Sequence, residues 1–201
     1  MDSKIQLSPF ETELLNNTEW ILTKNNIIRK AQQLLAIVQE NMVDYVKSNH
    51  GILPDEVLSV QPKISKGENY LGLPWLMLDY PRYFDKQQIF AIRTMFWWGN
   101  FFSITLHLAG KYKNQFSKSI TKHIREITER DFYYCIHEEQ WQHHLGQDNY
   151  KPLKDFSVEQ FEREFQNRPF LKLAKKFSLS TWNEAPQILP EEFVKITNWL
   201  D

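Results

Sequence analysis

Three of the six histidines in this chain lie within residues 137–144, beside two glutamates. Imidazole and carboxylate groups bind zinc, iron or manganese, and they also act as general acids and bases. The candidate metal ligands in this stretch are His137, Glu139 and His143. They predict, as an alternative function, a metal-dependent or acid/base enzyme of the hydrolase type.

The spacing of these three residues weakens that prediction. In a strand, His143 would lie roughly 13 Å from Glu139 at about 3.3 Å per residue, which is too far for one metal ion. In a helix, Glu139 and His143 could share an ion, but His137 would be one and a half turns from His143. The sequence leaves open whether residues 137–145 form a strand or a helix. We favour a polar strand face or a solvated helix face over a functional site.

An acid and a base lie on strand faces that are otherwise apolar. Asp79 and Arg93 each follow apolar residues at alternate positions, and a buried charge without a partner is costly. If the two strands are neighbours, a bidentate pair between Asp79 and Arg93 satisfies both groups. In the alternative arrangement, Arg93 lies at the base of a pocket and binds a carboxylate or a phosphate.

Positive charge is concentrated in one region of a chain whose net charge is only −1. From Lys86 to Arg125 there are seven Lys and Arg residues and no Asp or Glu. Within this region Lys118, Lys122 and Arg125 follow helical spacing and form one stripe. The stripe gives a second alternative, the binding of phosphate or nucleic acid. A solvated helix face is the simpler interpretation, because the chain as a whole is not basic.

A β-hairpin is expected to position most of the ligand-binding candidates. Gly99-Asn100 has the composition of a two-residue turn between strands at 89–98 and 101–108. This register places Thr94 opposite Thr105, on a face that mixes aromatic and polar residues. His107 on that face is more typical of a hydrogen-bonded core histidine than of a catalyst. The candidate ligand-binding residues of the hairpin and its neighbouring strand are Asp79, Arg93, Thr94, Phe96, Trp98, Ser103, Thr105 and His107.

The remaining elements are predicted from periodicity and capping residues. Apolar residues at helical spacing between Ile21 and Val46 predict a long amphipathic helix that ends near Gly51. Further strands are expected at 63–66, 71–80 and 132–136, and further helices after Ser8, at 114–127, and after Ser157, Pro169 and Pro190.

This order of elements, without regular alternation of strand and helix, favours an α+β fold. We expect a single domain over residues 1–201, with an antiparallel sheet of about four to six strands. The sheet is centred on residues 63–108 plus 132–145, and a long N-terminal helix and C-terminal helices pack against it.

Composition narrows the class of protein. With 42% hydrophobic and 24% charged residues, the chain is neither disordered nor collagen-like. The single cysteine, Cys135, excludes an internal disulfide and a zinc site made of several cysteines. The absence of a secretory signal after Met1 predicts a cytoplasmic protein. No apolar run approaches the roughly 18 residues of a membrane span, so we expect no membrane partner.

Aromatic residues make up 14% of the chain, and a large share of them lie between residues 70 and 112. Aromatic side chains with a few interspersed polar groups are typical of ligand sites. We therefore expect a small-ligand-binding or protein-interaction module with an aromatic-lined cleft. Its partner would be a small molecule or a protein, including a second copy of the chain, and nucleic acid is not favoured. The sequence indicates no particular cofactor and no particular catalytic residue.

Overall fold

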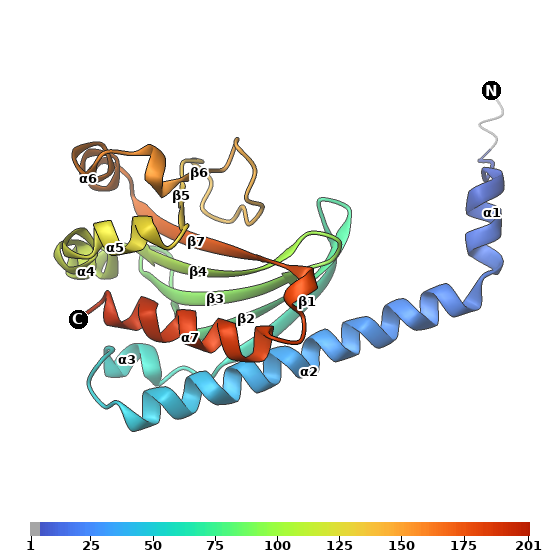
Figure 1. Ribbon diagram of the computed structural model, residues 1–201, viewed down its shortest axis with the longest axis horizontal. Helices are drawn as coiled ribbons and strands as arrows, with labels where there is room; N and C mark the ends of the chain where they lie inside the picture. Colours follow the sequence, from blue (N-terminus) through green and yellow to red (C-terminus); the bar gives the residue numbers. More distant parts are fainter. Residues whose placement is uncertain (1–4) are drawn as a thin grey trace.

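Seven antiparallel strands form one strongly bent sheet in the computed structural model, which describes residues 5–201 (Figure 1). Their order across the sheet is β1-β2-β3-β4-β7-β5-β6. The strands are β1 (Lys63–Tyr70), β2 (Leu73–Phe84), β3 (Ile89–Trp97), β4 (Phe101–Ala109), β5 (Tyr133–Cys135), β6 (Tyr150–Pro152) and β7 (Phe170–Ser178). The α+β class is therefore confirmed, although the sheet has more strands than expected.

The long helices lie on one face of this sheet, with α2 and α7 side by side across it (Figure 1). The helices are α1 (Pro9–Asn16), α2 (Thr18–Ser48), α3 (Asp55–Leu58), α4 (Lys111–Lys122), α5 (Ile124–Glu129), α6 (Val158–Asn167) and α7 (Ala185–Asn198), with short 3₁₀ turns at Leu153–Asp155 and Leu179–Thr181. No helix within residues 5–201 is both long enough and apolar enough to cross a membrane.

The main core lies between the sheet and these helices. Alternate side chains of the central strands point into it, and Leu78, Ile92 and Leu106 are completely buried. The second part of α2 supplies the facing surface at spacings of three and four residues, as its periodicity predicts. The buried residues of α2 are Ala31, Leu34, Leu35, Val38, Met42 and Val46. Because burial of one Val, Leu or Met side chain contributes about 1.5–3 kcal/mol, this contact is a substantial part of the stability of the fold.

The hairpin between β3 and β4 differs from its predicted register by one residue. Trp97, not Trp98, pairs with Phe101, because the turn has three residues with Gly99 at a φ of +70°. A shift of one residue moves side chains to the other face. The expected mixed face is therefore wrong: Thr94 and Phe96 pack under the helices. The opposite face holds Arg93, Ser103, Thr105 and His107.

Two predictions for the second half of the chain are also wrong. The helix expected after Pro169 is strand β7, which pairs with both β4 and β5. The first five residues of β7 are all buried, because both faces of the sheet are covered there, and the proline signal at Pro169 concealed this strand. Residues 136–149 contain neither helix nor strand, so the sheet takes only Tyr133–Cys135 from the region 132–145.

Candidate functional site

A segment without regular secondary structure, residues 136–149, covers part of the sheet face opposite the helices. It is fixed at both of its sides by side chains of the sheet. The hydroxyl of Tyr70, at the end of β1, accepts hydrogen bonds from the backbone N–H groups of His143 and His144, at 2.6 and 2.9 Å. Lys172 of β7 donates to two backbone carbonyls of the same segment. The charged residues of the sheet therefore lie beneath a lid of irregular chain, which we call the 136–149 segment.

Asp79 and Arg93 form the pair that their alternation predicts. They are opposite each other on β2 and β3. The Arg93 Nε donates to Asp79 Oδ1 at 2.7 Å and its Nη2 to Oδ2 at 3.3 Å. The guanidinium carbon also lies 5.4 Å from the ring centre of Phe84 and 5.8 Å from that of Trp141. The third nitrogen, Nη1, is buried and has no hydrogen-bond partner, so the arginine keeps an unused donor.

Lys172 is a second cation on this face and is completely buried. Its ammonium group donates to the carbonyl oxygen of Gln140 at 3.0 Å and to that of Gln142. No carboxylate among residues 5–201 lies within ion-pair distance of it. Burial lowers the pKa of Lys172 to about 8, and the side chain is therefore still mostly charged at pH 7.

Two histidines complete the group. The Nε2 of His107 lies 3.0 Å from Gln140 Oε1, while its Nδ1 is buried without a partner. Burial, and then the charges of Lys172 and Arg93, hold the pKa of His107 well below its usual value. The same causes lower the pKa of His143 to about 2. Both imidazoles are therefore neutral at pH 7. We call Asp79, Arg93, His107, His143 and Lys172 the basic cluster.

The charges of the basic cluster do not balance. Among these five residues, two cations, Arg93 and Lys172, face the single carboxylate of Asp79 at pH 7, and outside the five the charge of Glu139 also acts on Lys172. Backbone carbonyl dipoles compensate the lysine in part. Such a group can bind an anion, because arginine and lysine recognise carboxylate and phosphate oxygens.

A cavity of about 540 Å³ lies directly beside the cluster. Its lining includes the charged side chains of Lys86, Glu138 and Glu139. Gln140, Trp141 and Phe170 also line it, and these three residues contact His107. Gln140 bonds to the imidazole, and the ring centres of Trp141 and Phe170 lie 5.5 and 6.0 Å from it. One layer of side chains therefore separates the cavity from the cluster.

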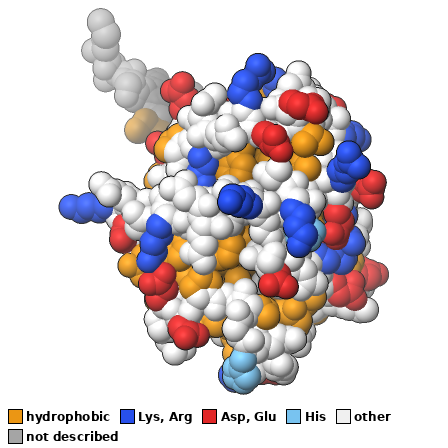
Figure 2. All heavy atoms as spheres, turned by 90° about the vertical axis from the view of Figure 1, so that its left-hand side faces the viewer, with side chains coloured by type: hydrophobic (Ala, Val, Ile, Leu, Met, Phe, Trp, Pro, Cys, Tyr) orange, Lys and Arg blue, Asp and Glu red, His pale blue; other side chains and the backbone are white. Residues whose placement is uncertain are grey.

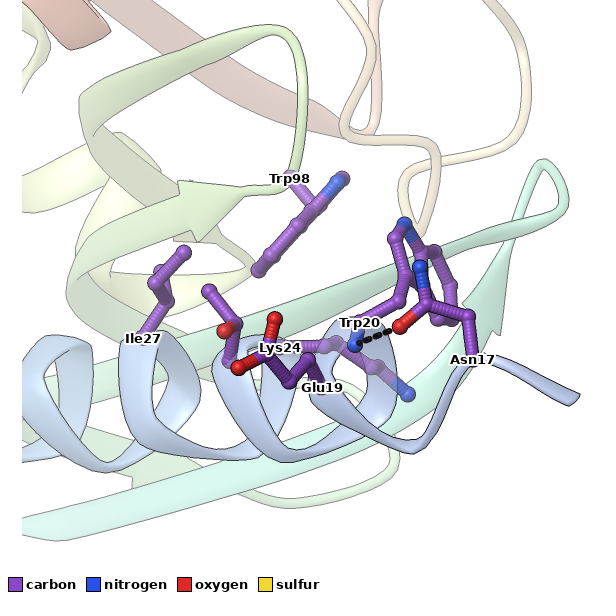
Figure 3. A pocket seen from close by; sticks show the side chains of 7 residues that line it. Asn17, Glu19, Trp20, Lys24, Ile27 and Trp98 are labelled. Atoms are coloured by element: carbon purple, nitrogen blue, oxygen red, sulfur yellow. Dashed lines mark hydrogen bonds between the residues drawn. The ribbon is translucent and has the colours of Figure 1, made fainter. Parts of the chain in front are cut away.

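The remaining ligand-binding candidates are distributed elsewhere. Phe96 packs against Phe102 and Trp182, with ring centres 5.5 and 5.8 Å apart, and Thr94 is completely buried beside it. Ser103 and Thr105 are buried on the face of the basic cluster. Trp98 lines a separate groove against α2 (Figure 3). The expected aromatic cleft is thus solid core where Phe96 lies.

The three candidate metal ligands do not converge. The Nδ1 of His137 accepts a hydrogen bond from the backbone N–H of Glu139, and Glu139 Oε1 accepts one from the backbone of Trp141. His143 lies instead against Tyr70, with ring centres 5.6 Å apart. Residues 5–201 contain no group of three or more His, Cys, Asp or Glu side chains placed to hold a metal ion.

The cationic stripe is interrupted. Lys118 and Lys122 lie on α4, whereas Arg125 lies on α5, after a break at His123. All three are exposed. On this side of the molecule, blue and red side chains alternate without a patch of one sign (Figure 2), and the hollow beside Lys118 is also lined by Glu162. This surface has the character of a solvated helix face.

Sequence reasoning missed Lys172, Gln140, Trp141 and Tyr70. The signal for Lys172 is present: one lysine stands in the apolar run Phe-Leu-Lys-Leu-Ala, which as a strand buries it. The contacts made by the 136–149 segment follow from tertiary packing and have no local signal. Comparison with family models, curated proteins and solved structures found no match for this chain.

Proposed function

We propose that this protein binds a small aromatic anion, a carboxylate or a phosphate monoester, at Arg93 beneath the 136–149 segment. The observation that carries the proposal is the excess of positive charge in the basic cluster. Among the described residues, Asp79 pairs with Arg93 alone, Lys172 has no carboxylate within ion-pair distance, and the Arg93 Nη1 has no hydrogen-bond partner. An anion in this place would offset a buried charge and accept the unused hydrogen bond.

The surroundings of Arg93 support an aromatic ligand. Phe84 and Trp141 are both partly exposed, and both lie within 6 Å of the guanidinium group. A ring carrying a carboxylate could pack against these side chains while its oxygens reach Arg93, as ligand sites combine apolar walls with a few polar groups. Asp79 would act as a positioning residue, because it holds Nε and Nη2 and leaves Nη1 for the ligand.

Trp141 is the side chain that would admit the ligand. It lines the 540 Å³ cavity on one side and contacts His107 and Arg93 on the other. It is 45% exposed and belongs to a segment without ladder hydrogen bonds. A rotation of this one side chain would join the cavity to the basic cluster.

Isothermal titration with benzoate and phenyl phosphate tests the proposal, with benzamide and benzyl alcohol as neutral analogues. We expect binding of the anions and at least about tenfold weaker binding of the neutral compounds, which corresponds to about 1.4 kcal/mol. Affinity for benzoate should fall as the pH rises above about 8, because Lys172 loses its proton there. Equal binding of neutral and anionic probes, or no binding at all, would overturn the proposal.

A matched set of variants locates the site. The double variant Asp79→Asn, Arg93→Gln removes both charges together, so that no unpaired charge remains buried. It should abolish benzoate binding while the thermal transition stays cooperative. Arg125→Gln removes an exposed arginine of α5 and should leave binding unchanged. The double variant leaves the net charge of the chain unchanged, whereas Arg125→Gln lowers it by one. Loss of benzoate binding in Arg125→Gln, or full binding in the double variant, would contradict a site at Arg93.

A further inference from the structure

The first 26 described residues form an arm that contains no buried residue and contacts the rest of the fold near its base, where Lys24 pairs with Glu68 and Ile28 packs against the core. Residues 5–30, which we call the N-terminal arm, comprise α1 and the first part of α2, and they extend away from the sheet (Figure 1). None of them is buried, and the first buried residue of the described chain is Ala31. An eight-residue helix such as α1 is far shorter than the roughly 12–15 residues that an isolated helix needs in water.

The arm is also strongly apolar on its surface. Seven of its large hydrophobic side chains are between 42% and 96% exposed. They are Ile5, Leu7, Phe10, Leu15, Trp20, Ile21 and Leu22. Together they expose an apolar area on the order of 800 Å², which is what each partner of a standard protein interface buries. An exposed apolar surface of this size marks an interaction site.

The charges of the arm indicate which partner covers it. Helix α1 carries Glu11 and Glu13 and no basic residue. The adjoining part of α2 carries exposed Arg29 and Lys30, and neither forms an ion pair within residues 5–201. The arm is thus acidic at one end and basic at the other. Two such arms in antiparallel orientation bring each acidic end to a basic end, as a two-fold symmetric interface requires.

A groove at the base of the arm could receive a side chain from the second arm. It has a volume of about 420 Å³ and lies between the first turns of α2 and the β3–β4 turn. Figure 3 shows Trp98 and Ile27 on its two sides, with Trp20 farther toward the tip of the arm. Trp20, Ile27 and Trp98 give it apolar walls, and Asn17, Glu19, Thr23 and Lys24 form its polar rim.

From these observations we infer that two copies of this chain pair through antiparallel N-terminal arms. In the antiparallel register that brings Glu13 of one copy to Arg29 and Lys30 of the other, Leu15 of each copy lies at the groove formed by Trp20, Ile27 and Trp98 of the other. The α1 helices then complete a four-helix contact with the first parts of α2. This pairing buries the apolar surface of both arms and places Glu13 of one copy near Arg29 and Lys30 of the other.

Sedimentation velocity of the full chain between about 1 and 100 µM tests the pairing, because standard interfaces of this size hold in that range. We expect a dimer for the natural sequence. Phe10→Glu and Leu15→Glu should each raise the dimer dissociation constant at least about tenfold. Leu71→Glu, a control at a 62% exposed leucine outside the arm, should leave it unchanged. All three positions are exposed, so folding is preserved and circular dichroism will verify it.

A charge exchange tests the antiparallel orientation. Glu13→Lys should weaken the dimer, as should Arg29→Glu with Lys30→Glu. The combination of all three should restore it, because the charges are then reversed in both arms. A monomer throughout the concentration range, equal effects of Leu71→Glu and Phe10→Glu, or a triple variant weaker than either parent would overturn the inference. Sedimentation of a monomeric chain with anionic phosphatidylserine vesicles would assign the arm to a lipid surface instead.

Discussion

Asp79 is the residue on which the electrostatic balance of the covered sheet face depends. Its carboxylate is nearly buried and binds Arg93 through two hydrogen bonds. Lys172 lies on the same face without a carboxylate of its own. Removal of this single negative charge leaves the Arg93 guanidinium without its ion-pair partner, on a face where Lys172 has no carboxylate partner in the described chain either.

We therefore predict that Asp79→Asn lowers the free energy of unfolding by about 3–5 kcal/mol, the usual result of breaking a buried ion pair from one side. Urea denaturation at pH 7 measures the change. Asp44→Asn is the matched control, because that carboxylate is 77% exposed and lies 3.8 Å from Lys47. It should change stability by less than about 0.5 kcal/mol. A loss below about 1 kcal/mol for Asp79→Asn would contradict the role given to the pair.

A residue of the site can be predicted from the sequence only where a local pattern indicates its environment. The Asp79–Arg93 pair could be predicted from the sequence, because a charge on an otherwise apolar strand face needs a partner of opposite charge. The structure confirms their contact. Lys172 has the same kind of signal within β7 but was hidden by the helical interpretation of that stretch. The partners of Tyr70 are backbone groups more than 70 residues away, and no local pattern indicates them.

At the scale of elements, the 136–149 segment is held in place by hydrogen bonds from side chains. A β-strand would instead be held by backbone hydrogen bonds to its neighbouring strand. Tyr70 holds one side of it through two backbone N–H groups, and Lys172 holds the other through two carbonyls. Arg168 adds hydrogen bonds to the carbonyls of Ile136 and His137, at 2.7 and 3.1 Å. The position of the lid over the basic cluster is therefore set by a few identifiable groups.

Tyr70→Phe should loosen this segment while the rest of the fold stays intact. It removes the acceptor of two backbone N–H groups, and an unsatisfied buried group costs about 1–3 kcal/mol. Hydrogen exchange measured by NMR should show faster exchange at the amides of His143 and His144, with unchanged protection in β3 and β4. Tyr133→Phe serves as the control, because that hydroxyl makes no hydrogen bond in the described chain. Unchanged exchange at both amides would refute this account of the segment.

The hairpin illustrates why registers are harder to predict than elements. Both strands were predicted within one or two residues, yet the turn has three residues where two were expected. That single extra residue separates Thr94 and Phe96 from Ser103, Thr105 and His107. Two-residue and three-residue turns both tolerate Gly-Asn, and which of them forms is decided by the packing of both sheet faces.

For the molecule as a whole, the two faces of the sheet have different chemical character. The helix-covered face is almost entirely apolar, which explains why the α+β class and the long helix α2 could be predicted from periodicity. On the other face, His107 of β4 and His143 of the covering 136–149 segment are both held neutral. Their burial makes the stability of the entire fold sensitive to acid.

The direction of this effect follows from the lowered pKa values of His107 and His143. Below pH 6.5 the unfolded chain protonates both imidazoles, whereas the folded chain does not. The free energy of unfolding should therefore fall as the pH falls, by up to about 1.4 kcal/mol per pH unit for each histidine. Urea denaturation between pH 7 and pH 5 tests this, above the range where most carboxylates titrate.

Two variants serve to assign the acid sensitivity. His143→Gln should roughly halve the slope of stability against pH, because one of the two imidazoles is removed. His50→Gln, at an exposed position, should leave the slope as it is. If the free energy of unfolding of the unsubstituted protein did not change between pH 7 and pH 5, this account of two histidines held neutral in the fold would be wrong.

The position of β7 in the sheet has a consequence for how the chain reaches its native state. This strand, residues 170–178, lies between β4 and β5 and pairs with both. Until it has been synthesised, a growing chain on the ribosome presents the whole edge of β4 as unpaired backbone. That edge is long and apolar, the kind of edge that invites pairing with another chain. Completion of the sheet must therefore follow translation of β7, and a nascent chain lacking it is the form most prone to aggregation.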